Sequence, residues 1–313
     1  MQLEQELAGF QNNQGSVVTI GVFDGVHLGH KYLINQVKEL ARKQGLCSVV
    51  ITFHKHPQEV LTPHSQPPFL TDSAEKADLL KKEGVDSVII LTFTRKVSRL
   101  SSREFLDLLK SKLQMRSLVV GPDFSLGRDN EGDISTLRQL AEELNFSLVV
   151  APAALKNGVI VSSTAIRKAL AEGDMDKVRL LLGRRFSLHG KVIRGHGRGL
   201  KIGFPTANLD ILPGQAVPGD GVYLTLVHMD GKVYRSLTNV GTNPTFRGAS
   251  RTIESHLFDL RCDLYEREIR VEFMRKLRNE IEFTNQEKLA QQIGEDIKQA
   301  KALLKVEAIT ENG

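Results

Sequence analysis

The feature that most constrains the fold of this chain is an apolar strand pattern that runs directly into a glycine-bearing turn and a helical pattern. The strand pattern covers Val17 to Ile20, and residues 21–30 after it read GVFDGVHLGH. The helical pattern begins near His27. Its apolar positions are Leu33, Val37, Leu40 and Ala41. This order predicts a buried strand, a tight turn and an amphipathic helix that follows the strand at once.

The start of that helix is a candidate phosphate site. A helix N-terminus exposes backbone N–H groups and carries partial positive charge. His27 and His30 are three residues apart, so both lie on one face of the first turn. Two imidazoles at such an end favour contacts to a triphosphate, whereas the plainer alternative is two histidines that only cap a helix. A dinucleotide-binding fold is disfavoured because no GxGxxG lies between this strand and helix.

Strand and helix patterns alternate as far as Gly183. Strands are expected at Val17–Ile20, Ser48–Phe53, Ser87–Phe93, Leu118–Val120 and Ser147–Ala151. Helices are expected at 31–43, 73–83, 102–114, 133–144, 163–171 and 175–182. This alternation favours a parallel sheet covered on both faces. Ser101 and Glu104 form a capping box, and the three prolines within 62–71 predict a surface loop near the nucleotide end of the sheet.

The residue pattern changes after Gly183. Short β-rich runs follow at Tyr223–Val227, Val233–Leu237, Glu254–Phe258 and Glu268–Phe273. With turn signals such as Asp230-Gly231 between them, they predict a small antiparallel barrel. A final helix is expected after a capping box at Thr284 and Glu287. We therefore expect two domains, residues 1–183 and 184–313.

Composition excludes several classes of protein. The chain has 313 residues, of which 41% are hydrophobic and 25% charged, as in ordinary globular proteins. No apolar run approaches the roughly 20 residues that span a bilayer, and the acidic, polar N-terminus does not resemble a secretory signal. Cys47 and Cys262 form no disulfide framework or zinc motif. A cytoplasmic protein without a transition-metal site, a membrane contact or an obligate protein partner is expected.

The placement of positive charge is more informative than the net charge of +5. Between Arg184 and Leu209 the chain has no acidic residue. The basic residues there are Arg184, Arg185, Lys191, Arg194, Arg198 and Lys201. A nucleic-acid patch is one interpretation, but the segment lacks interleaved aromatic residues and mixes its charges with glycine and proline. A loop around small phosphorylated ligands is favoured over a nucleic-acid partner.

A second group of candidate residues follows that loop. Thr206 and Asn208 are two apart in an extended segment and offer hard oxygen atoms on one side of it. Such oxygens suit Mg²⁺, which is usually held by few protein groups together with nucleotide phosphates. Glu254 lies in a strand pattern and can accept a proton from a substrate hydroxyl. An ordinary turn at 203–208 and a solvent-facing carboxylate at Glu254 remain open alternatives.

These segments resemble known families. The strand, turn, HxGH and helix of residues 17–43 resemble the class I nucleotidyltransferase superfamily. Nearly the whole chain is similar to the bacterial bifunctional riboflavin kinase/FMN adenylyltransferase family, also called FAD synthetase. That resemblance rests on GVFDGVHLGH (21–30), GPDFSLGRDNEGD (121–133), VSSTAIRKAL (161–170), GRGLKIGFPTANLD (197–210), NVGTNPTF (239–246), ESHLFD (254–259) and LRNEIEF (277–283).

The resemblance implies an α/β nucleotidyltransferase-type domain followed by a six-stranded flavokinase barrel with a C-terminal helix. The barrel domain would phosphorylate riboflavin with ATP to give FMN. The first domain would couple FMN to the AMP part of a second ATP, which yields FAD and pyrophosphate. Magnesium would serve as the cofactor.

The resemblance also assigns roles to individual residues. His27 and His30 would steady the triphosphate, and Glu254 would be the base of the kinase. Thr206 and Asn208 would bind Mg²⁺. The nucleotide- and phosphate-binding residues would be Gly21, Phe23, Asp123, Ser163, Thr164, Arg167 and Gly203, and His56 would lie on the flavin side.

The chain departs from the family pattern at a few positions. Val22 stands where the family often has asparagine, and Lys55 stands in place of a proline. Ala165 and Ile160 replace basic residues at or before the SSTxxR segment, and Glu266 replaces a common glycine. Two alternative functions are a cytidylyltransferase, which would leave residues 184–313 unexplained, and a flavin-binding regulator that has lost catalysis.

Overall fold

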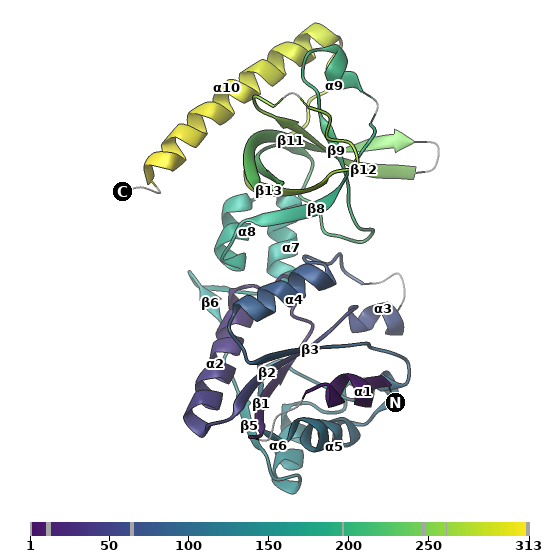
Figure 1. Cartoon of the computed structure of the whole chain (residues 1–313), viewed down its shortest axis with the longest axis vertical. Coiled ribbons are helices and arrows are strands. Elements are labelled where there is room, and N and C mark those ends of the chain that lie inside the picture. The colour runs from purple at the N-terminus through teal and green to yellow at the C-terminus, as the bar shows by residue number, and fades with distance from the viewer. Residues whose placement is uncertain are drawn as a thin grey trace. The chain divides into compact units, whose positions relative to one another are not determined.

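The computed structural model describes residues 2–10, 14–62, 66–195, 197–245, 248–260 and 262–310. They form two compact units, Met1–Ala165 and Ile166–Gly313 (Figure 1). The first unit contains the expected parallel sheet and the second contains the expected barrel, so the predicted fold class is confirmed. No helix of the described residues combines the length and the apolar character needed to cross a membrane.

The sheet of the first unit has five parallel strands in the order β3-β2-β1-β4-β5. The strands are β1 (Ser16–Ile20), β2 (Cys47–Phe53), β3 (Ser87–Leu91), β4 (Met115–Val120) and β5 (Ser147–Val150). All five lie where the sequence predicted strands. β1 and β4 are neighbours in the sheet although β2 and β3 come between them in the chain. The order of the strands therefore reverses between β1 and β4, which is where open parallel sheets bind ligands.

Helices cover both faces of this sheet. The helices are α1 (Gln2–Ala8), α2 (Leu28–Gln44), α3 (Pro57–Leu61), α4 (Ser73–Lys82), α5 (Ser102–Leu113) and α6 (Ile134–Glu143), with short 3₁₀ turns at Val97–Arg99 and Arg128–Asn130. Val17 belongs to a core cluster with residues of α2. Val18 belongs to another core cluster with residues of α1, α5 and α6. Because β1 is buried on both sides, its apolar residues are continuous rather than alternating.

Some local features of the first unit differ from the expectation. α1, α3 and the hairpin of β6 (Leu155–Lys156) and β7 (Val159–Ile160) were not predicted. The capping box of Ser101 and Glu104 at α5 is confirmed. The proline-rich segment is not wholly a surface loop, because its last residues, Leu70 and Thr71, are buried. Residues 63–65 of that segment lie outside the described residues.

The second unit is a closed barrel in the order β10-β11-β12-β9-β8-β13. Its strands are β8 (Phe186–Ile193), β9 (Ala207–Asp210), β10 (Gly221–Met229), β11 (Lys232–Thr245), β12 (Gly248–Leu257) and β13 (Glu268–Arg278). Asp230 and Gly231 have φ of 50° and 73° at the β10–β11 turn, as their sequence predicts. Glu266 has a φ of 67°, a conformation that favours glycine.

Among the described residues, four helices belong wholly or partly to the second unit. They are α7 (Ser163–Glu172), which begins in the first unit, α8 (Met175–Leu182), α9 (Arg198–Lys201) and α10 (Gln286–Thr310). α8 packs against β8 and β13. The expected cap of α10 is wrong by one residue. Asn285, rather than Thr284, accepts a hydrogen bond from the Lys288 backbone N–H at 2.9 Å, and asparagine is at least as good as threonine in that position.

Candidate active sites

The first candidate site lies at the carboxyl ends of β1 and β4, where the strand order reverses. The 21–27 turn follows β1 and leads into α2. Gly121 to Phe124 follows β4 and contains Asp123, whose side chain is exposed. The topology therefore brings two sequence-predicted motifs to one edge of the sheet.

His27 and His30 lie together at the start of α2. His27 caps the helix, since its Nδ1 accepts a hydrogen bond from the His30 backbone N–H at 3.3 Å. The two rings are stacked, with centroids 3.6 Å apart and planes 14° from parallel. The Nδ1 atom of His30 is buried and has no hydrogen-bond partner. His27 therefore has the capping role of the plainer alternative, whereas His30 leaves a ring nitrogen unused by the protein.

The turn before these histidines has an unusual backbone. Phe23 and Val26 have φ of 52° and 38°, which is uncommon for residues with a side chain and most of all for a β-branched one. Both side chains are buried. The Phe23 ring meets the His30 ring edge-on, with centroids 5.1 Å apart. A Cβ on Gly29 would lie only 3.1 Å from the His27 ring and 3.0 Å from the Val161 carbonyl oxygen. Packing and backbone together thus fix the imidazole pair in one position.

Two charged residues of this region were not predicted from the sequence. Asp24 is buried, and its Oδ1 accepts hydrogen bonds from the backbone N–H groups of Leu70 and Thr71 at 2.8 and 3.2 Å. Lys76 of α4 is also buried, and its Nζ donates to the Phe53 carbonyl oxygen at 2.6 Å. Burial lowers the pKa of Lys76, although the carboxylates of Asp24, Asp72 and Glu59 act in the opposite direction. A lysine four residues after Asp72 has the pattern of an ordinary solvated helix residue, so its burial could not be predicted.

The start of α7 is tied to the same turn. Ser163 Oγ donates to the Asp24 carbonyl oxygen at 2.9 Å. Ser162, which was not singled out in the sequence, accepts a hydrogen bond from the Ala165 backbone N–H at 3.2 Å. Thr164 is exposed, whereas Arg167 is half-buried and belongs to the second unit. The structure thus brings Ser163 to the turn.

Two further predicted residues have local structural roles. Gly21 lies against Phe23, because a Cβ there would be 3.2 Å from that ring. His56 caps α3, and its Nδ1 accepts a hydrogen bond from the Gln58 backbone N–H at 3.2 Å. Their assignment to nucleotide and flavin contacts stays a prediction.

The pKa of His30 can be used to test whether its ring is buried in the folded protein. Burial, followed by the nearby His27 and Lys76, lowers the pKa of His30 well below its usual value. Between about pH 6.5 and that lowered pKa, the unfolded chain binds a proton that the folded chain does not, so stability falls as the pH falls through this window. We expect the melting temperature of the wild type to fall more steeply below about pH 6.5 than that of His30→Gln. Thermal melts at several pH values measure this. An equal fall of melting temperature with pH in the two proteins would contradict the burial of His30.

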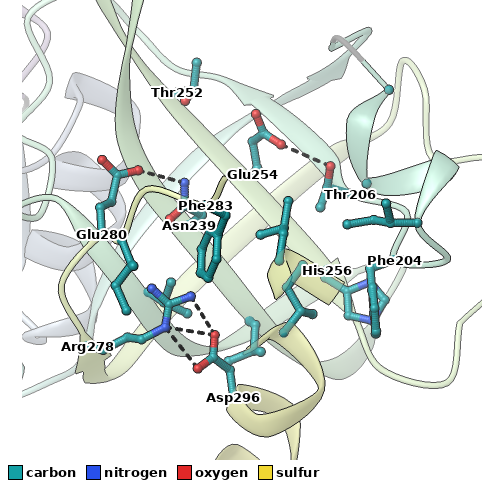
Figure 2. Close-up of a pocket in the computed structure, with 18 of the residues that line it drawn as sticks. Phe204, Thr206, Asn239, Thr252, Glu254, His256, Arg278, Glu280, Phe283 and Asp296 are labelled. Carbon is teal, nitrogen blue, oxygen red and sulfur yellow. Dashed lines mark hydrogen bonds and ion pairs between the residues drawn. The ribbon is translucent and has the colours of Figure 1, made fainter. Parts of the chain in front are cut away.

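The second candidate site is a cavity of about 340 Å³ in the second unit, between the barrel and α10 (Figure 2). Its apolar walls include Ile202, Phe204, Val222, Leu237, Ile281, Phe283, Leu289 and Ile293. Its polar lining includes Thr206, Asn239, Thr242, Thr252, Glu254, His256, Arg278, Glu280 and Asp296. A cavity that combines apolar walls with polar groups at defined places is typical of small-molecule sites.

The cavity lining includes the predicted base Glu254 and one of the two predicted magnesium ligands, Thr206, but not Asn208. Thr206 Oγ1 donates to Glu254 Oε2 at 3.2 Å (Figure 2). Asn208 in β9 is the register partner of Glu254 in β12. A Cβ on Gly195 would overlap the Asn208 amide, so the glycine leaves room for that side chain. Three residues from two distant motifs are therefore brought to one place.

The glycine-rich loop contributes to the cavity through residues other than the predicted one. Gly197 and Gly199 line the cavity, but Gly203 does not. A Cβ on Gly199 would overlap the Phe204 carbonyl oxygen. His256 Nδ1 donates to the Pro205 carbonyl oxygen at 2.8 Å and so fixes the segment before Thr206. His196 and the Arg198 and Lys201 side chains lie outside the described part of the chain.

Comparisons with known families agree with this division into two sites. The model of the FAD synthetase family matches residues 9–165. The model of the riboflavin kinase family matches residues 182–304. The first match covers the sheet with the histidine pair, and the second covers the barrel with the cavity.

Other known proteins match nearly the whole chain. The bifunctional riboflavin kinase/FMN adenylyltransferase of Pseudomonas fluorescens is 38% identical over 306 residues, which are 97% of this chain and 98% of the relative. The Escherichia coli K12 protein of the same name is 38% identical over 90% of this chain and 91% of its own. A solved structure named macrolide-efflux protein, from Streptococcus pneumoniae, has a TM-score of 0.86 at 30% identity and covers 96% of this chain and 97% of its own. The chain therefore belongs to the bifunctional riboflavin kinase/FMN adenylyltransferase family and has both activities of that family.

Proposed function

We propose that riboflavin is phosphorylated in the cavity of the second unit, with Glu254 as the general base. The observation that supports this most is the contact of Glu254 with Thr206 in a cavity that also has apolar walls. The apolar walls suit the flat flavin ring, and the carboxylate suits the terminal hydroxyl of its sugar-alcohol chain. Glu254 takes the proton of that hydroxyl as the oxygen attacks the γ-phosphorus of ATP, and ADP leaves.

We propose Thr206 and Asn208 as the protein ligands of Mg²⁺ in this reaction. Thr206 contacts Glu254, and Asn208 in β9 is the register partner of Glu254. Neutral oxygen ligands suit an ion that takes few protein ligands and several phosphate or water oxygens. When bound, the ion would neutralise charge that develops on the phosphate oxygens. Thr206 would then exchange its contact with Glu254 for the ion, which frees the carboxylate to accept the substrate proton.

The proposed metal ligands can be tested by a magnesium titration. Thr206→Val keeps the shape of the side chain and removes its oxygen. We expect the Mg²⁺ concentration for half-maximal FMN production to rise about tenfold or more. FAD formation from supplied FMN by the same variant is the control and should keep its Mg²⁺ dependence. An unchanged titration for FMN production would exclude Thr206 as a ligand.

We propose that adenylyl transfer takes place at the carboxyl ends of β1 and β4. The phosphate oxygen of FMN would attack the α-phosphorus of ATP directly, and pyrophosphate would leave. Such a step needs positioning and charge neutralisation rather than an enzyme nucleophile. The unused nitrogen of His30 at a helix N-terminus supports a role in stabilising charge on the phosphates. Asp123, Ser163, Thr164 and Arg167 are proposed to hold the nucleotide and the departing pyrophosphate.

Two further statements stay predictions. The two activities are proposed to divide near residue 183, whereas the compact units divide after Ala165 and the family models leave residues 166–181 unmatched. A cytoplasmic location is likewise a prediction.

A further inference from the structure

α10 is held to the barrel differently at its two ends. Near its C-terminal end, Ala300 and Leu304 are buried in a core cluster with Val222, Leu224 and other residues of the barrel. Toward its N-terminal end the helix covers the cavity, which Leu289 and Ile293 line. Over a cavity, apolar packing cannot by itself fix the distance between a helix and the barrel, because the contacts that would set it are missing.

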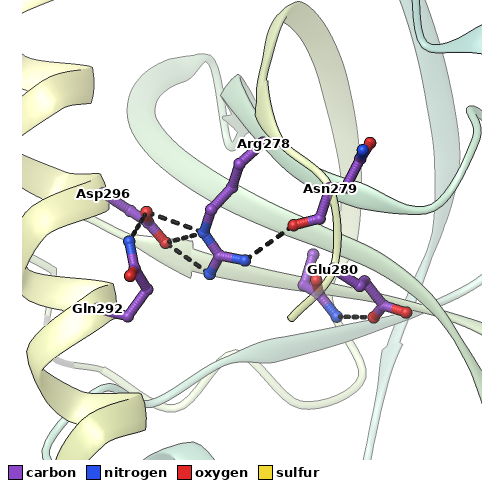
Figure 3. Close-up of polar contacts among 6 residues, drawn as sticks. Arg278, Asn279, Glu280, Gln292 and Asp296 are labelled. Carbon is purple, nitrogen blue, oxygen red and sulfur yellow. Dashed lines mark hydrogen bonds and ion pairs between the residues drawn. The ribbon is translucent and has the colours of Figure 1, made fainter. Parts of the chain in front are cut away.

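A partly buried ion pair joins the two elements at this place. Arg278 is the last residue of β13, and Asp296 lies within α10. Arg278 Nε lies 3.0 Å from both Oδ1 and Oδ2 of Asp296, and Nη2 lies 2.8 Å from Oδ2 (Figure 3). The exposed fractions of the two side chains are 18% and 3%. Contacts of this kind fix direction as well as distance, which a single point contact does not.

Both partners are satisfied by the protein alone. Arg278 Nη1 donates to the Asn279 carbonyl oxygen at 3.0 Å, so each of its three nitrogens has a protein partner. Asp296 Oδ1 also accepts a hydrogen bond from Gln292 Nε2 at 3.0 Å (Figure 3). A pair that is complete without a ligand is suited to position the cavity wall rather than to bind the substrate.

The pair also anchors segment 279–285, which connects β13 to α10. Ile281 and Phe283 of this segment line the cavity, and the Arg278 guanidinium lies 5.9 Å from the Phe283 ring centroid. Glu280 of the same segment accepts a hydrogen bond from Asn239 Nδ2 of β11 at 3.1 Å (Figure 2). The apolar wall on this side of the cavity is therefore held between two polar contacts.

We propose that Arg278 and Asp296 are a positioning pair for riboflavin. Their contact sets the spacing between the barrel and the wall formed by segment 279–285 and α10, so that a flat aromatic ring is in contact on both faces. The inference rests on the proposed location of riboflavin in this cavity. It assigns the pair to the affinity for the flavin and not to the phosphoryl-transfer step.

Full-length variants test the pair. We expect Asp296→Asn to raise the dissociation constant of riboflavin, measured by flavin fluorescence without ATP, about tenfold or more. The rate of FMN production at saturating riboflavin should change less than about twofold, because the reacting groups are untouched. Arg278→Lys keeps the charge but loses the two-point contact, so an intermediate loss of affinity is expected. Arg275→Gln, on the same strand but paired with Asp176 at the exposed surface, is the matched control.

A folding defect is separated from loss of positioning by two further measurements. FAD formation from supplied FMN by Asp296→Asn should equal that of the wild type, and a thermal melt reports the folded fraction. The double variant Arg278→Met with Asp296→Leu leaves no unpaired buried charge but lacks the directional contact, so it should fold and still bind riboflavin weakly. Unchanged riboflavin affinity in this folded double variant, or in Asp296→Asn, overturns the proposal.

Failure of the proposed location is recognised separately. Ile293→Trp places a large side chain in the cavity and should abolish riboflavin binding if the flavin occupies it. If Ile293→Trp binds riboflavin normally, the flavin lies elsewhere and both the location and the positioning role are wrong. If Ile293→Trp blocks binding while the pair variants bind normally, the location stands and the positioning role alone is overturned.

Discussion

Replacing His30 with alanine is expected to reduce FAD formation from FMN about a hundredfold or more, which corresponds to the roughly 3 kcal/mol lost with a transition-state hydrogen-bond donor. The side chain presents a buried nitrogen without a protein partner beside the first turn of α2. It is held there by the His27 ring and the Phe23 ring. FMN production from riboflavin should be unchanged, because its site lies in the other unit. Chromatography of the flavins gives both rates.

The plainer role of these histidines predicts a different result. If His30 only packs at the end of a helix, the alanine variant should melt at a lower temperature but keep normal FAD formation per folded molecule. Tyr32→Ala is a suitable control, since it removes a partly exposed ring from the same helix. Normal FAD formation by a destabilised His30→Ala protein would exclude the catalytic role.

Replacing Glu254 with glutamine is expected to reduce FMN production about 10²- to 10⁴-fold, the usual cost of losing a general base. Glutamine keeps the size and the ability to contact Thr206, but it cannot take a proton from the riboflavin hydroxyl. The dissociation constants of riboflavin and ATP should change little. Initial rates of FMN production and flavin fluorescence titrations measure the two effects separately.

An exposed carboxylate of the same barrel provides the control for this variant. Glu268→Gln at the start of β13 makes the same chemical change away from the cavity. It should leave FMN production at the wild-type rate. FMN production near the wild-type rate by Glu254→Gln itself would eliminate Glu254 as the base and leave its contact with Thr206 as a structural feature.

The elements predicted best from the sequence are those with strong local signals. β1 and the start of α2 were predicted from an apolar run and a glycine turn, and the cap of α5 was predicted from Ser101 and Glu104. β8 was missed although its apolar residues Phe186, Leu188 and Val192, all buried, lie at alternate positions of the strand. Gly190 interrupts that alternation, because a Cβ there would overlap the Asp210 carbonyl oxygen of β9. The reason for this glycine is a neighbouring strand, which no local pattern contains.

In the candidate sites, too, local spacing could be predicted from the sequence, but contacts between distant segments could not. Histidine spacing indicated that His27 and His30 share a face, but not that their rings stack or that Phe23 lies against them. The burial of charged residues could not be predicted from the sequence, since lysine and aspartate are normally exposed. Lys76 and Asp296 are buried only because a strand carbonyl and Arg278 approach them from distant parts of the chain.

Two independent sites should produce FMN and FAD, and the two variants measured side by side test their independence. His30→Ala and Glu254→Gln are each incubated with ATP and Mg²⁺ and with either riboflavin or FMN, and the flavins are then separated by chromatography. The predicted result is a crossed pattern. His30→Ala converts riboflavin to FMN at the wild-type rate but makes little FAD from either flavin, while Glu254→Gln makes FAD from FMN at the wild-type rate but little FMN from riboflavin. Loss of both activities in either variant, per folded molecule, would show that the two sites do not act independently.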